Sequence, residues 1–276
     1  MSAYTRELWP RALRPMPPRV TADFAMPYRQ LRRHLRALAA PERNRQANIH
    51  LGLVLAGVAG ATNAGGFLAV QEYTSHMTGV VSSMADALAL GQVLSALDWF
   101  TSLLSFVLGA ATSAILINWG RQQGARQVFA LPLMLESVLL LVFGLMGAGH
   151  HLIGSSMGAT VALLCFVMGL QNAMVTKISH AEIRTTHVTG LVTDIGIELG
   201  KLLYWNESGL PADRKVKANL DRLRLHVGLV CAFFLGGLMG ALGFKHLGYV
   251  ATVPLAILLA LMATPQYLPD ARRARP

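Results

Sequence analysis

The sequence has few charged residues and almost no cysteine. Only 14% of its 276 residues are Asp, Glu, Lys or Arg, against 53% hydrophobic residues, whereas soluble domains carry about a quarter charged residues. The two cysteines, Cys165 and Cys231, both lie in apolar runs, which argues against a disulfide framework or a cysteine metal site. A soluble globular protein is therefore excluded, and the long apolar runs indicate an all-α polytopic membrane protein.

Signatures of catalysis and cofactor binding are also scarce. The chain has no His-Glu-x-x-His motif, no P-loop and no dinucleotide-binding glycine pattern. The pair His150-His151 lacks a third ligand at metal-binding spacing. We therefore expect no enzyme activity, no cofactor and no metal. The net charge of +10 is better explained by membrane topology than by nucleic acid, so no nucleic-acid partner is expected.

Six apolar segments are long enough to cross about 30 Å of hydrocarbon as helices. They are Leu51–Val70, Trp99–Trp119, Val128–Met146, Ile153–Val175, Leu225–Phe244 and Leu247–Ala263. Two further segments, Val80–Leu97 and Leu191–Tyr204, contain acidic residues, and the second reaches only about 21 Å as a helix. We expect both to be short polar half-helices that re-enter without crossing. The alternative is that both cross, which gives eight spans.

Basic residues favour the six-span topology. With six spans and an internal N-terminus, 23 of the 24 Lys and Arg residues lie on the cytoplasmic side, and only Lys245 lies outside. Eight spans would place five basic residues outside. We therefore expect a multi-pass protein of the bacterial inner membrane with both termini cytoplasmic. Its basic parts are a tail at 1–47, a loop at 205–224 and a C-terminal tail at 265–276.

The N-terminal tail has two interpretations. Leu31, Leu35 and Leu38, with arginines between them, form a short basic amphipathic helix that could lie on anionic membrane lipid. The simpler interpretation is a solvated basic tail that fixes the orientation of the chain.

Short motifs recur in the two halves of the chain. The segment 60–64 recurs at 169–173, the segment 74–79 recurs at 185–190, and the segment 105–109 recurs at 232–236. On the six-span topology, the first half (48–150) enters the membrane from the cytoplasm and the second (151–264) enters from outside. The sequence therefore predicts a 3+3 inverted repeat, which is typical of many transporters and some channels.

Polar residues of the repeated motifs are the candidate substrate-binding or pore-lining residues. They are Asn63, His76, Thr78, Gly79, Gln171, Asn172, His187, Thr189 and Gly190. A threonine that caps each half-helix would leave free N–H groups at the membrane centre, which favour an anionic or carbonyl-bearing solute. Structural roles stay open as alternatives: Thr-Gly as a helix cap, histidine as an interfacial anchor, and asparagine as an interhelical hydrogen-bonding group.

Acidic residues within or near the spans are candidates for proton coupling. Glu136 lies deep in a long apolar span, where burial allows a neutral carboxyl group. Asp86, Asp194 and Glu198 are secondary candidates, with an interfacial position as the alternative. Separately, the glycines at 236 and 240 indicate close helix packing and allow a seam for a homo-oligomer.

The paired pattern Gly-x-x-Asn-Ala with Met-Thr-Gly, then Gly-Leu-Gln-Asn-Ala with Val-Thr-Gly, resembles the YoaK-like family of bacterial inner-membrane proteins. The resemblance covers about residues 48–264. It rests on Gly60, Asn63, Ala64, Thr78, Gly79, Gly169, Gln171, Asn172, Ala173, Thr189 and Gly190. The family usually has aspartate at the position of Asn63 and asparagine at that of Val80, so this chain departs at both. The resemblance implies a membrane protein suspected of small-molecule transport, and it supplies no substrate.

We therefore expect a transporter or channel for a small solute, with its site at the interface of the two repeats. The alternative is a non-transporting membrane scaffold or sensor. Transport predicts a central cavity lined by both Thr-Gly elements, whereas a scaffold predicts a fully packed core.

Overall fold

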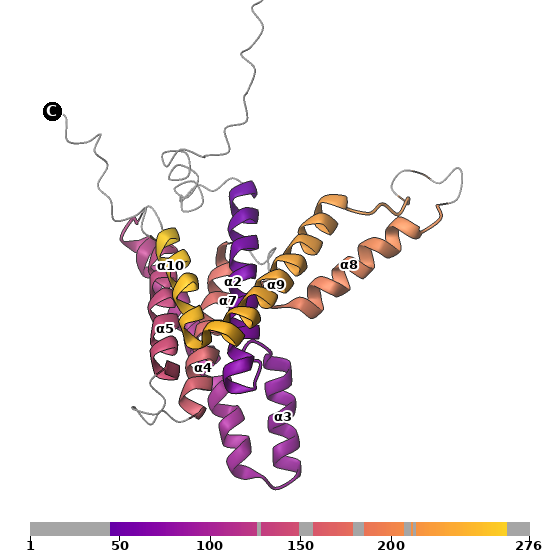
Figure 1. The fold of residues 1–276 in the computed structure, drawn as a ribbon. Helices are drawn as coiled ribbons and strands as arrows, with labels where there is room; N and C mark the ends of the chain where they lie inside the picture. Colours follow the sequence, from indigo (N-terminus) through magenta and orange to yellow (C-terminus); the bar gives the residue numbers. More distant parts are fainter. Residues whose placement is uncertain are drawn as a thin grey trace, which may run out of the picture.

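The computed structural model describes residues 45–125, 128–148, 157–178, 185–206, 211 and 214–263, and these residues form helices and turns but no strand (Figure 1). The helices are α2 (Arg45–Val70), α3 (Met77–Ala89), α4 (Val93–Gln122), α5 (Ala130–Ala148), α7 (Met157–Ile178), α8 (Val188–Leu203), α9 (Leu220–Leu247), the 3-10 helix η1 (Gly248–Ala251) and α10 (Thr252–Ala263). The amphipathic segment around Leu35, the pair His150-His151 and most of both basic tails lie outside the described residues.

Five stretches of the described chain are long and apolar enough to cross a membrane. They are Asn48–Val70, Val93–Gln122, Ala130–Ala148, Gly158–Ile178 and Leu220–Ala263. The structure therefore supports an all-helical, multi-pass membrane protein. The last stretch contains α9, η1 and α10 together, so the predicted sixth span is not a separate long helix. Gly248, with φ of 59°, starts η1, and α10 has only 12 residues, about 18 Å.

The predicted bounds of the first polar segment are wrong. The segment Val80–Leu97 is divided, because α3 ends at Ala89 and the residues from Val93 onward belong to α4. Gly91 lies between them with φ of 71°, a left-handed conformation that glycine adopts readily and that ends the helix. The helices α3 and α8 have 13 and 16 residues, about 20 and 24 Å, and neither is long enough to cross.

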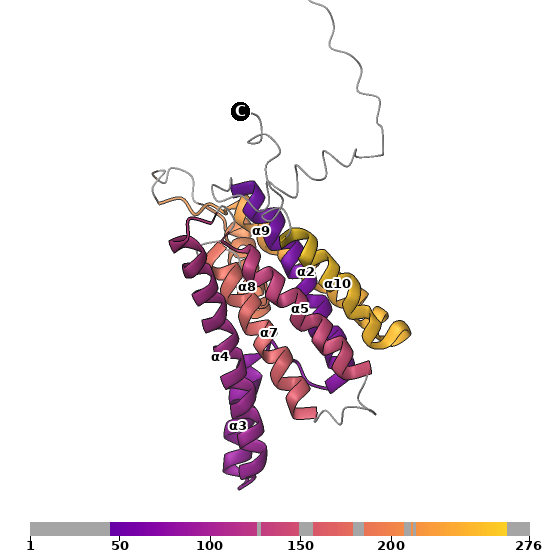
Figure 2. The same cartoon turned by 90° about the vertical axis from the view of Figure 1, so that its left-hand side faces the viewer.

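Helix contacts follow the order of the two halves. The main pairs are α2 with α9, α4 with α7, α5 with α10, α3 with α4, α8 with α9, and α5 with α7. When α2, α3, α4 and α5 are matched in order with α7, α8, α9 and α10, the first five pairs map onto another pair or onto themselves, whereas α5 with α7 has no comparable counterpart between α10 and α2. Figure 1 shows α3 running to the lower end of the bundle and α8 to the upper end, and Figure 2 shows α5 beside α10.

Four glycines bring the paired long helices into backbone contact. A Cβ atom added to any of them would lie 2.0 Å from a carbonyl oxygen of the partner helix, so no side chain fits. The glycine and carbonyl pairs are Gly60–Phe233, Gly169–Phe106, Gly109–Phe166 and Gly236–Gly57. Gly60 and Gly169 are 109 residues apart, and Gly109 and Gly236 are 127 apart. Both offsets are those of the recurring motifs, so the same close contact is made twice.

The glycines at 236 and 240 serve this intrachain packing. A Cβ atom on Gly236 would meet the carbonyl oxygen of Gly57, and one on Gly240 would lie 2.4 Å from the carbonyl oxygen of Ala61. Both glycines therefore face α2 of the same chain. The predicted close helix packing is therefore confirmed, and it is formed within the chain.

Candidate functional site

An asparagine on each of α2 and α7 binds the loop that precedes a short helix. The Oδ1 atom of Asn63 accepts hydrogen bonds from the backbone N (3.4 Å) and the Oγ (2.8 Å) of Ser75. The Oδ1 atom of Asn172 accepts a hydrogen bond from the hydroxyl of Thr186. Because these residues occupy matching places in the recurring motifs, the same side chains position the starts of α3 and α8.

The short helices start one residue before their threonines, at Met77 and Val188. His76 and His187 are the N-cap residues, and neither side chain makes a capping hydrogen bond. The prediction that Thr78 and Thr189 cap these helices is therefore wrong. The backbone N–H groups of Val80 and Leu191 bind the carbonyls of the histidines, while the first N–H groups of a helix have no intrahelical acceptor.

A cavity of about 800 Å³ lies where the two helix starts meet. It is lined by Asn63, Tyr73, Ser75, His76, Met77, Thr78, Phe106, Asn172, Thr186, His187, Val188, Thr189 and Phe233. Twelve of these thirteen residues form six pairs that occupy matching positions in the two halves. The thirteenth, Tyr73, stacks on Phe67 with ring centroids 4.4 Å apart. The position that matches it, 184, lies outside the described residues.

The described walls of the cavity are polar and carry no permanent charge. No Asp, Glu, Lys or Arg occurs among the described lining residues, whose side chains are hydroxyl, amide, imidazole, aromatic and aliphatic. Two helix N-termini end there, each equivalent to about half a positive charge. The described walls therefore give a positive local field without a cationic side chain.

Gly79 and Gly190 lie beneath the two cavity histidines. A Cβ atom on Gly79 would be 2.4 Å from Nδ1 of His76, and one on Gly190 would be 2.4 Å from Cδ2 of His187. Glycine at these positions lets each imidazole fold over the first turn of its own helix. A larger residue would displace the histidine from the cavity wall.

Other predicted site residues lie away from the cavity lining. Gln171 is fully buried and donates from Nε2 to the carbonyl of Leu55 at 3.3 Å. Glu136 is fully buried on α5, and neither carboxylate oxygen has a hydrogen-bonding partner among the described residues. Asp86 is exposed on α3.

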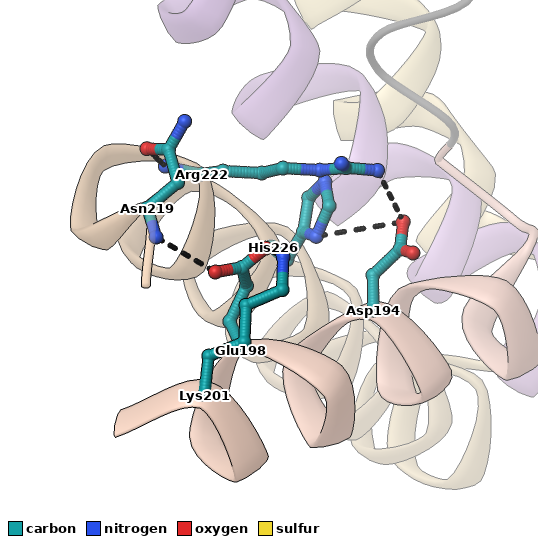
Figure 3. A network of polar contacts seen from close by, with 6 residues as sticks. All are labelled: Asp194, Glu198, Lys201, Asn219, Arg222 and His226. Atoms are coloured by element: carbon teal, nitrogen blue, oxygen red, sulfur yellow. Dashed lines mark hydrogen bonds and ion pairs between the residues drawn. The ribbon is translucent and has the colours of Figure 1, made fainter. Parts of the chain in front are cut away.

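The remaining predicted residues, Asp194 and Glu198, belong to a charge cluster between α8 and α9 (Figure 3). The cluster consists of Asp194, Glu198, Lys201, Asn219, Arg222 and His226. Glu198 accepts hydrogen bonds from Lys201 Nζ at 2.8 Å and from the backbone N of Asn219 at 2.7 Å. Asp194 pairs with Arg222 at 3.1 Å and lies 3.8 Å from Nδ1 of His226. The hydrogen bond from Lys201, and then that from Asn219, lower the pKa of Glu198 below its ordinary value.

Sequence reasoning missed several lining residues. Phe106 and Phe233 lie in a recurring segment, but an aromatic residue in an apolar span looks the same whether it faces lipid or a cavity. Ser75 and Thr186 lie in the recurring loop motifs, and their repetition was a usable signal. Tyr73 carries no repeated signal, because the motif begins after it.

Metal and hydrolase chemistry have no support in the described part of the chain. No group of three His, Cys, Asp or Glu residues there could hold a metal ion. The sequence 154–158 reads Gly-Ser-Ser-Met-Gly and fits the letters of Gly-x-Ser-x-Gly. That hydrolase motif requires a strand before the serine, and the residues at that position, 149–156, lie outside the described residues.

Long apolar helices that surround a polar cavity place the chain among integral membrane proteins. Its particular family is the one described as "Protein of unknown function (DUF1275)", which matches residues 51–264, and the chain belongs to it. The YoaK-like resemblance of the sequence is consistent with this family. No curated protein and no solved structure matches the chain.

Proposed function

We propose that the chain is a transporter or channel for a small solute and that the solute binds in the cavity between the two halves. The observation that carries this proposal is the cavity of about 800 Å³ whose walls are supplied by six pairs of matching residues, one from each half. Many transporters bind substrate between inverted repeats, at discontinuous helices. A scaffold needs no such cavity.

The proposed arrangement is a 3+3 inverted repeat with six crossings. The matched helix pairs and the duplicated glycine contacts support it, because they map onto one another when the first half is exchanged with the second. In this arrangement α10 makes the last crossing together with η1, and α3 and α8 are half-helices. Non-helical backbone at membrane depth is tolerated beside a polar cavity, where protein and water satisfy its polar groups.

The proposed orientation places the α8–α9 end in the cytoplasm of a bacterial cell. Arg214, Lys215, Lys217, Arg222 and Arg224 lie at this end, before or within the first turns of α9. The segment 71–98, which contains α3 and its turn into α4, has by contrast no Lys or Arg. Basic residues collect on the cytoplasmic side of inner-membrane proteins, so α3 would then face the periplasm.

A glycine pair on α8 provides a matched test. Gly190→Val adds bulk beneath His187, whereas Gly196→Val, six residues further along the same helix, meets nothing within 4 Å. We would compare metabolite uptake and export, by mass spectrometry, between a deletion strain and strains that express wild type or either variant. Membrane abundance would be measured in the same cells.

We expect the wild type and Gly196→Val to restore the metabolite profile and Gly190→Val to fail at equal membrane abundance. A wild-type strain whose internal and external metabolites match those of the deletion strain would contradict transport. Equal profiles from both valine variants would contradict a site at the α8 start.

A further inference from the structure

The described walls of the cavity offer hydrogen-bond donors but no negatively charged side chain. The starts of α3 and α8 both contribute lining residues, and the first N–H groups of each helix have no intrahelical acceptor. Among the residues that the structure describes, no carboxylate lines the cavity to neutralise this field. That a ligand binds here rests on the proposed function. The expected charge of that ligand follows from the groups that line the cavity.

A buried amide adds an independent donor. Asn63 is only 9% exposed and lines the cavity, and its Oδ1 atom is occupied by Ser75. Its Nδ2 group has no acceptor among the described residues. The matching Asn172 differs, because its Nδ2 donates to the carbonyl of Met168 at 2.8 Å. The Asn63 amide is therefore a donor group without an acceptor in the described part of the chain, which is costly unless a ligand or water accepts from it.

The apolar part of the lining also comes from both halves. Phe106 and Phe233 face the cavity from α4 and α9, and Met77 and Val188 are the first residues of the short helices. A cavity of about 800 Å³ lies in the range that holds organic ligands, about 300–1,000 Å³. An inorganic anion would leave the aromatic walls without contact.

We propose that this cavity binds an organic monoanion, a carboxylate carried on an apolar, planar body. The carboxylate accepts from the Asn63 amide and from the N–H groups at the helix starts. The apolar body packs between the two phenylalanines. A cation of the same shape is disfavoured by both helix ends.

Three isosteric probes that differ in charge test the proposal. Benzoate, benzamide and benzamidinium carry charges of −1, 0 and +1 on nearly the same planar body. Binding of each to the purified full chain in detergent would be measured by calorimetry. We expect benzoate to bind about tenfold more tightly than benzamide, and benzamidinium to show no binding. Equal affinity for benzoate and benzamide, a preference for benzamidinium, or no binding by any probe would overturn the proposal.

A matched pair of variants locates the donor. Asn63→Asp keeps an oxygen that accepts from Ser75 but replaces the donating amide with a negative charge. Asn118→Asp makes the same change at an exposed position that contacts Lys177 outside the cavity. We expect about tenfold weaker benzoate binding in Asn63→Asp and wild-type binding in Asn118→Asp. Unchanged benzoate affinity in Asn63→Asp would overturn the assignment, and the charge series on wild type stands even when this variant does not fold.

The outcomes separate this proposal from the transport proposal. If the chain prefers benzamide while the metabolite profile depends on the protein, the proposal of an anionic ligand is overturned. The transport proposal is then retained. Selective benzoate binding with unchanged metabolite profiles would retain the anion site and contradict transport.

Discussion

The α3–α4 and α8–α9 hairpins occupy matching places in the two halves, yet they are held together differently. Buried Glu198 of α8 binds Lys201 and the start of α9, whereas the matching residue of α3 is Ala87, which is buried against α4. The N-cap residues also match in position. Asn219 accepts a hydrogen bond from the N–H of Arg222, while Gln92 makes no side-chain capping bond.

This difference shows where the two halves agree and where they diverge. The glycine contacts and the asparagine–loop hydrogen bonds are duplicated. The hairpin ends instead differ in charge, which agrees with the proposed orientation, in which they lie at opposite membrane surfaces. Duplicated features therefore mark the packing and the cavity, and divergent features mark the ends.

The largest effect is expected at the duplicated glycine contacts. Gly60→Val and Gly169→Val each force a side chain against a backbone carbonyl of the partner helix, so both should lower the free energy of unfolding by roughly 3 kcal/mol. Gly158→Val, which meets nothing within 4 Å, should cost less than about 1 kcal/mol. Thermal unfolding in detergent, followed by tryptophan fluorescence, measures all three. A large loss of stability in only one of the variants Gly60→Val and Gly169→Val would contradict the equivalence of the two contacts.

A smaller effect is expected from the charge cluster. Because the folded state lowers the pKa of Glu198, its ionised form stabilises the fold above the ordinary value of 4.5, and this contribution is lost as pH falls through the lower folded-state value. Glu198→Gln should therefore lower Tm at pH 7 and flatten the dependence of Tm on pH in the acid range.

The control for this prediction is Asp221→Asn, which removes an ion pair with Arg224 whose two side chains are both 77% exposed. Exposed pairs contribute little to stability, so Tm should barely change. Equal losses of Tm in Glu198→Gln and Asp221→Asn would show that the cluster does not clamp α8 to α9.

The smallest effect is expected at Glu72, in the loop between α2 and α3. Partial burial, and then the nearby charge of Asp98, raise the pKa of this carboxyl group. The ionised form therefore destabilises the fold above the raised pKa, and the penalty disappears below 4.5. Glu72→Gln should raise Tm slightly at pH 7 and leave it unchanged near pH 3. A lower Tm at pH 7 would contradict this sign.

The length and hydropathy of the apolar segments were sufficient to predict most long helices, because crossing a membrane requires a continuous apolar run. They were not sufficient for the α3–α4 boundary, since the break at Gly91 lies inside a mostly apolar run and depends on one backbone angle. The sixth predicted span likewise has the right composition, but its first turn is η1, which begins at Gly248.

Repetition located much of the candidate site. Asn63, His76 and Thr78, with their matching residues, were predicted together and line one cavity. Thr78 was given the wrong local role, because a Thr-Gly pair does not determine at which residue a helix begins. The burial of Glu198 depends on contacts with α9 that follow a long loop, and no local pattern reveals them.

The attachment of each short helix has a mechanical consequence. Because α3 packs mainly on α4, and α8 mainly on α9, each pair forms an arm that carries both a helix start and a phenylalanine of the cavity wall. A tilt of α4 against α7 moves Met77 and Phe106 together, and a tilt of α9 against α2 moves Val188 and Phe233 together. The cavity wall thus belongs to two helix pairs, each of which packs on the other half through its own glycine contacts.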